Sequence, residues 1–241
     1  MYQYNSRIRY SEIGEDGRLT LTSVINYFQD CSTFQSEDCG VGIQYLEEQG
    51  KAWMLSSWRI LIRRYPEFGE KITVGTWPYG NKGIYGYRNF VMEDEAGCRL
   101  VEADSTWFLL DLEKGLPCRV MEADVAPYGV PGNRIPMEAA PKKLILPSAY
   151  EEGAPITVST HHIDTNHHVN NAQYVEMARE AADSRLPVRE LRVDYKKAAV
   201  LGDVICPKIS WDGTAVTVAL HNGQEQACAV VWMKAGEEKN D

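Results

Sequence analysis

The sequence predicts an α+β protein in which two similar units follow one another, each made of a long helix wrapped by an antiparallel sheet. The first observation is an internal repeat, because residues 13–27 superpose without a gap on residues 163–177. The second is the region between the copies, where five of the eleven prolines lie at positions 127, 131, 136, 141 and 147. Such a composition is typical of a linker.

One helix is expected in each copy of the repeat. Apolar residues recur there at three- and four-residue spacing, which is the period of an amphipathic helix. They are Leu21, Val24, Ile25, Phe28 and Cys31 in the first copy, and Ala172, Val175, Ala178 and Ala182 in the second. Asn170 stands where the second helix should begin, and with Gln173 it has the outline of a capping box.

Strands follow each helix and complete the two copies. Residues 59–65 resemble residues 192–197, with basic pairs at matching places. Further β-rich runs flank turn signals in each copy. These runs cover residues 86–92, 100–110, 215–220 and 227–233, and the turns lie at residues 95–97 and at Asn222-Gly223. We therefore predict a first domain over residues 1–126, a linker over 127–150, a second domain over 151–236 and a tail over 237–241.

Charge and composition exclude several classes of protein. With 34 acidic and 25 basic residues, the net charge of −9 argues against a basic nucleic-acid-binding protein. The longest stretch without Asp, Glu, Lys or Arg covers residues 213–224, which is shorter than the roughly 18 apolar residues of a membrane-spanning helix. The first residues are polar and charged, so no secretory signal is expected and we predict a cytosolic location.

Neither a metal nor another cofactor is expected. The six cysteines are dispersed and include no C-x-x-C pair. The only two that lie close in sequence, Cys31 and Cys39, have no histidine nearby. His161 and His162 are adjacent, but alternate strand positions would point their side chains apart.

The two copies differ most in the loop before the helix. The residues G-E-D-G-R at 14–18 are replaced by D-T-N-H-H at 164–168. Asp164, Asn166 and His168 thus precede a helix whose first N–H groups lack intrahelical partners. A carboxylate can deprotonate water or attack directly, an amide can hold that water, and free helix N–H groups can stabilise an oxyanion. The loop therefore predicts a hydrolytic site.

A structural role is the alternative, because Asp, Asn and His commonly cap helices and close turns in loops. A purely architectural role would be expected in both copies, however, and the polar set occurs only in the second.

The segment D-T-N-H-H-V-N-N at residues 164–171 resembles the D-x-N-x-H-V-N-N motif of the acyl-[acyl carrier protein] thioesterases, the plant-type enzymes and their bacterial relatives. Residues 53–58, Arg63-Arg64-Tyr65-Pro66 and Gly69-Glu70 are also similar to the first domain of that family. The resemblance covers nearly the whole chain. It implies two tandem hotdog domains with the active site in the second. The implied reaction, in fatty acid biosynthesis, is hydrolysis of fatty acyl carrier-protein thioesters to free fatty acid and carrier thiol without a cofactor.

The resemblance also implies roles for individual residues. Asp164 would be the base or nucleophile, Asn166 would orient water or substrate, and His168 would orient or protonate the reacting group. Asn170 and Asn171 would open the helix and take part in substrate binding. The residues implied to line an acyl-chain tunnel are Trp53, Met54 and Trp58, although side chains of this kind more often fill a core.

One feature of the family is missing. Its members often carry Glu-Cys after the basic pair, whereas this chain has Ala198-Ala199. A cysteine nucleophile is therefore excluded at that position, and Asp164 lacks the glutamate that would share the water. Asp194 and Glu176 are the candidates to compensate.

The implied partner is an acyl carrier protein that carries a fatty acyl thioester. Three basic pairs could contact this acidic partner, namely Arg63-Arg64, Lys142-Lys143 and Lys196-Lys197. Three other activities stay open: an acyl-CoA thioesterase, a hotdog dehydratase or hydratase, and a non-catalytic acyl-binding protein. The chain is expected to be a monomer or a homodimer.

Overall fold

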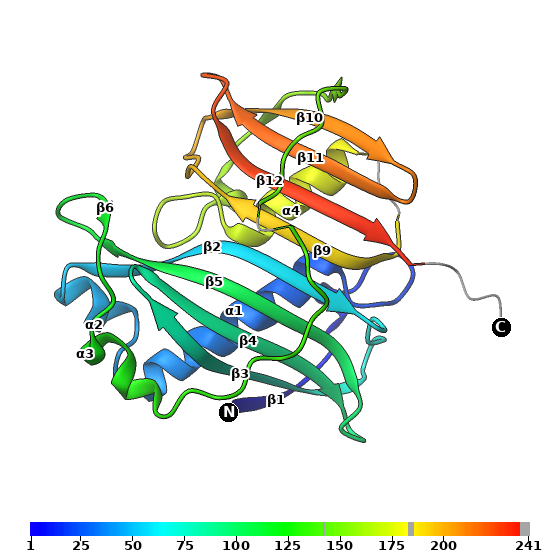
Figure 1. Cartoon of the computed structure of the whole chain (residues 1–241). Coiled ribbons are helices and arrows are strands. Elements are labelled where there is room, and N and C mark those ends of the chain that lie inside the picture. Colours follow the sequence, from blue (N-terminus) through cyan, green and yellow to red (C-terminus); the bar gives the residue numbers. More distant parts are fainter. Residues whose placement is uncertain (142, 183–185, 237–241) are drawn as a thin grey trace. The chain divides into compact units, whose positions relative to one another are not determined.

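The structure, a computed structural model, describes residues 1–141, 143–182 and 186–236. It divides into two compact units, the first made of Met1–Ser56 and Ile62–Glu138, the second of Ser57–Leu61 and Ala139–Asp241 (Figure 1). Lys142 and the predicted tail at residues 237–241 lie outside the described residues. No helix in the described ranges is long and apolar enough to cross a bilayer.

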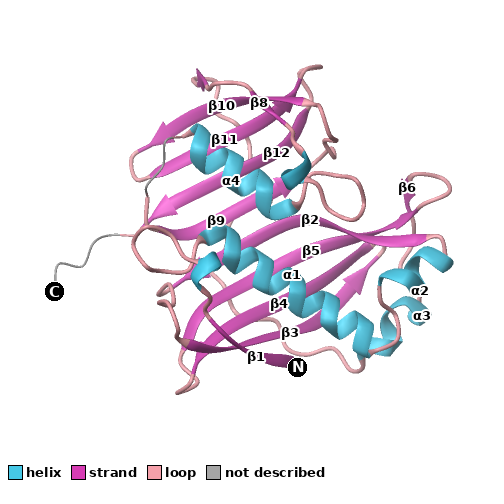
Figure 2. Ribbon diagram, turned by 180° about the vertical axis from the view of Figure 1, so that it is seen from behind, coloured by secondary structure: helices cyan, strands magenta, loops and turns pink. Residues whose placement is uncertain are grey.

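The first unit is an antiparallel sheet with one long helix, α1 (Leu21–Asp38), packed on it (Figure 2). The strand order is β1-β3-β4-β5-β2, with β6 beside β5. The strands are β1 (Tyr2–Arg7), β2 (Lys51–Ile62), β3 (Lys71–Lys82), β4 (Tyr85–Asp94), β5 (Arg99–Asp111) and β6 (Leu116–Pro117). Shorter helical segments are η1 (Tyr10–Glu12), α2 (Ile43–Glu48), α3 (Glu122–Val125) and η2 (Ala126–Tyr128).

The second unit repeats this plan with helix α4 (Asn171–Ala181), which packs on three of its strands. Residues 57–61 of β2 form one end of its sheet and are followed in space by β9, β12, β11, β10 and β7, with β8 also paired to β10. The strands are β7 (Glu151–Glu152), β8 (Ile156–Thr157), β9 (Val188–Tyr195), β10 (Val204–Asp212), β11 (Ala215–Asn222) and β12 (Ala227–Ala235), and a short turn η3 (Thr160–His162) precedes α4. The predicted α+β class, with one main helix packed on antiparallel strands in each unit, is confirmed.

Helix α1 forms where the apolar period predicts it. Thr20 caps its first turn, because its Oγ1 accepts a hydrogen bond from the Ser23 N–H at 3.1 Å. Val24 and Phe28 are 0% exposed on its inner face. The Phe28 ring lies 5.2 Å from the ring of Phe90 on β4, so the periodic face of the helix is the face that the sheet buries.

Equivalent hydrogen bonds recur in the two units. In the first unit the Gly69 N–H donates to the Ile8 carbonyl at 3.0 Å. In the second unit the Gly202 N–H donates to the Val158 carbonyl at the same distance of 3.0 Å. The repeat predicted from the sequence is therefore a repeat of backbone geometry as well as of residue type.

The segment that follows η2 runs along the sheet face opposite α1 in the first unit. Trp77 Nε1 donates to the Asn133 carbonyl at 2.8 Å, and the Ile135 N–H donates to Asn89 Oδ1 at 2.9 Å. These two hydrogen bonds hold residues 133 and 135 of the proline-rich segment against side chains of β3 and β4.

Strands β1, β3 and β10 were not among the predicted elements. Two of them contain prolines, Pro78 in β3 and Pro207 in β10, which argue against a central strand. Pro78 lies beyond the part of β3 that pairs with β1, and Pro207 lies between the residues of β10 that pair with β7 and with β8. Each proline thus lies where its strand has a neighbouring strand on one side only. Its missing N–H therefore removes no hydrogen bond between strands.

Glu70 should stabilise the turn between β2 and β3 in a pH-dependent way. Its carboxylate accepts from both Nη atoms of Arg64 at 2.6 and 2.8 Å and from the Glu67 N–H at 2.9 Å. Arg64, the largest influence, lowers the pKa of Glu70 from its ordinary value. Because the group is partly exposed, we expect Glu70→Gln to cost about 1 kcal/mol of unfolding free energy at neutral pH.

The pH dependence of this difference has a definite sign. A carboxyl whose folded-state pKa is lowered stabilises the fold above its unfolded-state pKa, and the stabilisation is lost as the pH falls through the folded-state pKa. Urea denaturation of both proteins over a falling pH series measures this difference. A gap between native and Glu70→Gln that stays constant at every pH would contradict the ion pair as its cause.

Candidate active site

The predicted site loop is a tight turn between η3 and α4 in the second unit. The Asp164 N–H donates to the His168 carbonyl at 2.8 Å, and the His167 N–H donates to the Asp164 carbonyl at 3.1 Å. In the first unit the same turn is closed by a bond of 2.8 Å from the Gly14 N–H to the Arg18 carbonyl. The two loops thus have the same backbone frame and differ in the side chains that they carry.

His167 is the strained member of this loop. Its φ is 61°, in the left-handed region, whereas the matching residue of the first unit is Gly17 at 74°. A side chain in this region costs on the order of 1 kcal/mol or more, and such strain is concentrated at functional sites. The sequence analysis did not select His167, although the pairing of a histidine with a glycine in the repeat was a signal available there.

Asp164 is half-buried, and one of its two oxygens holds the loop. Oδ1 accepts from the Asn166 N–H at 2.8 Å and from the His168 N–H at 3.2 Å. Oδ2 has no hydrogen-bond partner among the described residues. The architectural role considered for this residue is therefore real, and it leaves the second oxygen available for chemistry.

The other two predicted catalytic residues have different surroundings. Asn166 is exposed, and its backbone N–H rather than its amide contacts Asp164. His168 is half-buried, and its Nδ1 is a buried nitrogen without a hydrogen-bond partner in the described part of the chain. Buried polar atoms without a partner are rare in folded proteins, which makes this nitrogen a candidate contact for a substrate.

Asn170 and Asn171 shape the start of α4. Asn170 Oδ1 accepts from the Ala172 N–H at 2.9 Å, which confirms it as the helix cap, and its carbonyl accepts from the Gln173 N–H at 2.9 Å. Two of the first helix N–H groups, which the sequence suggested as oxyanion donors, therefore already have partners. The Asn171 carbonyl accepts from the Tyr195 hydroxyl at 2.9 Å.

Replacement of Asn170 tests its role as the cap of α4. We expect Asn170→Ala to lower the unfolding free energy by about 1 kcal/mol, because the cap to Ala172 is lost. Asn170→Asp keeps an oxygen acceptor and should retain most of that stability. Chemical denaturation of the three proteins measures the effect, and equal losses in both variants would contradict the cap.

Ala199, which follows α4 in the sequence, anchors the loop through backbone hydrogen bonds. It is 0% exposed, and its carbonyl accepts from the Val169 N–H at 2.9 Å, directly after His168. Its own N–H donates to the Tyr174 hydroxyl at 2.8 Å. Burial raises the pKa of Tyr174 well above its ordinary value, so this phenol stays neutral. Tyr174 is a site neighbour that sequence reasoning missed, because nothing local marks it. Position 199 was considered only for its side chain, so the role of the Ala199 backbone was missed as well.

Two family models match this chain. The acyl-ACP thioesterase N-terminal domain matches residues 1–128, and the acyl-ACP thioesterase C-terminal domain matches residues 148–234. The chain belongs to the acyl-ACP thioesterase family. The palmitoyl-acyl carrier protein thioesterase of Arabidopsis thaliana is 23% identical over 214 residues, which cover 82% of this chain and 52% of that protein. The chain thus spans about half the length of the curated relatives it matches.

Solved structures of the acyl-ACP thioesterases show the same fold. The acyl-ACP thioesterase from Bacteroides thetaiotaomicron superposes with a TM-score of 0.85 at 22% identity, covering 96% of each chain. The 12:0-ACP thioesterase from Umbellularia californica also gives 0.85, at 17% identity, covering 97% of this chain and 96% of that chain. These likenesses confirm the predicted tandem hotdog fold.

The residues considered as substitutes for the family's glutamate have their own contacts. Asp194 Oδ2 accepts from the Leu144 N–H at 2.8 Å, so this carboxylate holds a residue of the predicted linker against β9. Glu176 lies on α4 with Arg179 at 3.9 Å. Ala198, at the position of the family's glutamate, is exposed directly beside the anchor residue Ala199.

The three predicted tunnel residues do not fall in one unit. Trp53 and Met54 belong to the first unit and Trp58 to the second. Trp58 is 2% exposed, as expected of a core residue. Trp53 is half-buried, and a Cβ added at Gly86 would lie 3.2 Å from its ring, so the indole rests on the glycine.

The basic pairs differ in how far their charges are neutralised. Arg63 pairs with Glu102 at 3.2 Å, and Arg64 with Glu70 at 2.6 Å. Lys196 and Lys197 are exposed, and the only side-chain bond from either in the described chain runs from Lys197 to the neutral amide of Gln226. Lys142 of the third pair lies outside the described residues, so of the two pairs that the structure describes in full, Lys196-Lys197 is the one without an acidic side chain bonded to it.

His161 and His162 correct a sequence expectation. They lie in the turn η3 rather than in a strand, and their ring centroids are 3.9 Å apart instead of pointing away from each other. Both Nδ1 atoms face the Ser159 hydroxyl, at 3.0 and 3.3 Å. Among the described residues no group of three or more His, Cys, Asp or Glu side chains is placed to hold a metal ion.

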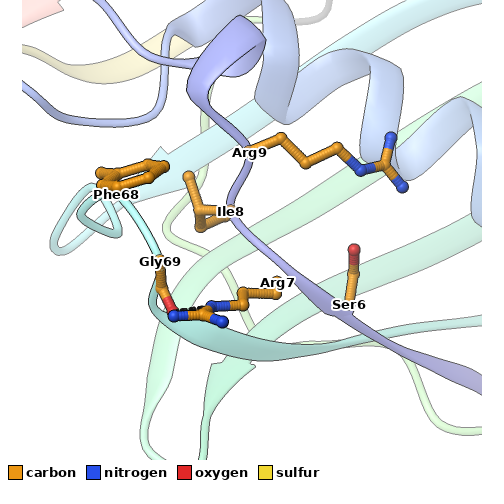
Figure 3. Close-up of a pocket in the computed structure, with 6 residues that line it drawn as sticks. All are labelled: Ser6, Arg7, Ile8, Arg9, Phe68 and Gly69. Atoms are coloured by element: carbon orange, nitrogen blue, oxygen red, sulfur yellow. Dashed lines mark hydrogen bonds between the residues drawn. The ribbon is translucent and has the colours of Figure 1, made fainter.

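A surface pocket of about 400 Å³ lies in the first unit (Figure 3). Arg7 is one of its lining residues, and the Arg7 Nε donates to the Gly69 carbonyl at 2.8 Å. No predicted site residue belongs to its lining, which consists of Ser6, Arg7, Ile8, Arg9, Phe68 and Gly69.

Proposed function

We propose that this chain hydrolyses fatty acyl thioesters of acyl carrier protein. The relatives carry this activity in their names, as palmitoyl-acyl carrier protein thioesterase and acyl-[acyl-carrier-protein] hydrolase. The observation that carries the proposal is the contrast between the matching loops of the two units, which share the same backbone turn but carry different side chains. Only the second combines a carboxylate oxygen without a partner in the described chain, at Asp164, with a buried and unpartnered imidazole nitrogen, Nδ1 of His168, because the first loop contains no histidine.

In the proposed reaction Asp164 acts as the general base. Its Oδ2 takes a proton from water while the water oxygen attacks the thioester carbonyl. The tetrahedral intermediate then collapses, the carbon–sulfur bond breaks, and the proton passes to the departing thiolate. His168 Nδ1 would hold the water or the carbonyl oxygen, and Asn166 would contact the substrate from the exposed side of the loop.

The proposal assigns the chemistry to the second domain, residues 151–236, and acyl-chain binding to the first, residues 1–126, joined by the linker at 127–150. Trp53 and Met54 would contact the acyl chain in the first domain. The carrier protein is acidic, and the unneutralised Lys196-Lys197 pair of the second domain would attract it at low ionic strength. We place the enzyme in the cytosol.

Thiol release from a panel of acyl thioesters tests the activity. Each acyl chain is presented both on acyl carrier protein and on coenzyme A, and thiol and free acid are measured together. Release from the carrier-protein substrates at higher kcat/KM is the expected result. Faster release from coenzyme A would identify an acyl-CoA thioesterase instead. A change of unsaturation without thiol release would indicate a dehydratase, and tight binding without turnover a non-catalytic acyl-binding protein.

A further inference from the structure

A charged side chain lies inside the first unit. Arg88 on β4 is 9% exposed and projects toward α1, on the same face as Phe90. Its Nη1 donates to Gln35 Oε1 on α1 and, at 3.2 Å, to Thr76 Oγ1 on β3. The Tyr128 ring lies 5.1 Å from the guanidinium carbon. All of these partners are neutral.

This guanidinium has no carboxylate partner among the described residues. Other arginines of the same unit have one, since Arg64, Arg99 and Arg134 reach carboxylate oxygens at 2.6, 2.7 and 2.6 Å. Arginine keeps its charge in proteins, and a buried charge costs several kcal/mol unless it is paired. Burial lowers the pKa of Arg88, which records that cost. Gln35 lies in the last turn of α1, whose carbonyls offset part of it.

The unused edge of Arg88 has a specific geometry. Both of its hydrogen bonds leave from Nη1, so Nε and Nη2 have no hydrogen-bond partner in the described chain. These two atoms form the side of the guanidinium that binds a carboxylate with parallel N–H bonds. Arg134 uses this same edge in the same unit, because its Nε and Nη2 donate to Asp104 Oδ2 at 3.1 and 2.6 Å.

The layer between α1 and the sheet is apolar beside this charge. Phe28, Val74, Phe90 and Met92 are each 0% exposed there. A ligand that fits both features joins an aliphatic chain to a carboxylate. We propose that Arg88 binds the carboxylate of an aliphatic acid inside the first unit. Resting on the proposed function, the proposal allows two sources of that group: the fatty acid released by hydrolysis, or the far end of a dicarboxylic acyl chain still on its carrier.

Calorimetric binding of dodecanoate and of dodecanol to the full chain tests the proposal. At a pH where the acid is ionised, native protein should bind dodecanoate roughly tenfold or more tightly than dodecanol. Arg88→Met should remove this preference. Arg88→Lys should keep only part of it, because lysine lacks the paired N–H donors that bind both oxygens of a carboxylate. Arg18→Met, at an exposed arginine of the same unit, is the matched control and should bind like native protein.

Kinetics distinguish the two sources. If the dicarboxylic chain is the source, its half-thioester on carrier protein has a lower KM than the monocarboxylic thioester of equal length, and Arg88→Met loses the difference. If the released acid is the source, dodecanoate competes with substrate in native protein and not in Arg88→Met. Equal binding of dodecanoate and dodecanol to native protein overturns the proposal, and so does a preference that persists in a folded Arg88→Met. The calorimetric result is readable without turnover, so a failure of the thioesterase activity is recognised separately.

Discussion

Asp164→Asn is expected to lower kcat by about 10²–10⁴-fold, the range that a positioned general base supplies. The variant keeps an oxygen that accepts from the N–H groups of Asn166 and His168, so the turn before α4 should keep its shape. What it loses is the charge and basicity of the second oxygen. Thiol release under saturating substrate measures the change, and chemical denaturation verifies that the unfolding free energy stays close to the native value.

The repeat provides a matched control for this variant. Asp16 in the first unit also accepts from the backbone two residues ahead, with its Oδ1 at 3.0 Å from the Arg18 nitrogen. Asp16→Asn changes the same charge in the corresponding turn and should leave kcat unchanged. Native-like turnover in Asp164→Asn would contradict the proposed base, and a matching loss in Asp16→Asn would mean that the effect is not specific to the second loop.

Phe28→Ala is expected to lower the free energy of unfolding by about 3–5 kcal/mol, the usual cost of removing a phenylalanine from a packed core. Phe28 is 0% exposed on α1 and its ring lies 5.2 Å from that of Phe90. The substitution leaves a cavity between the helix and the sheet of the first unit. Urea or guanidinium denaturation followed by tryptophan fluorescence measures the loss.

Phe34 on the same helix is the control for this prediction. It is 46% exposed, and its ring lies edge to face with that of Tyr4, with 5.4 Å between the ring centroids. Phe34→Ala should therefore cost about 1 kcal/mol or less. Equal losses in the two variants would contradict the assignment of the inner face of α1.

The elements that sequence reasoning found are those whose signal is local. The apolar period of α1 and α4 and the turn at Asn222-Gly223 can be recognised within a few residues, and the structure has helices and a hairpin at these places. Strands β3 and β10 were not predicted, and each contains a proline, which argues against a central strand. Whether a proline is tolerated depends on which neighbouring strand is absent, and that is decided by pairing between distant segments.

The candidate site shows the same division between local and distant information. The sequence selected Asp164, Asn166 and His168 because their loop differs from the matching loop of the first copy. It also suggested free helix N–H groups as oxyanion donors, and the structure gives two of them to Asn170. The sequence pattern predicts a cap, but only the folded loop shows which N–H groups that cap occupies.

The sequence by itself determined the repeat, the α+β class, the family and the polar set before α4, because each is written in the order and spacing of neighbouring residues. Tertiary structure alone decided that Ala199 and Tyr174 anchor the loop of the candidate site, and that Asp164 uses one oxygen to hold that loop and leaves the other for the proposed chemistry. It also decided that Arg88 is buried without a carboxylate in the described chain. These contacts and this burial involve residues that are far apart in the sequence. No local pattern predicts them, because packing alone brings such residues together.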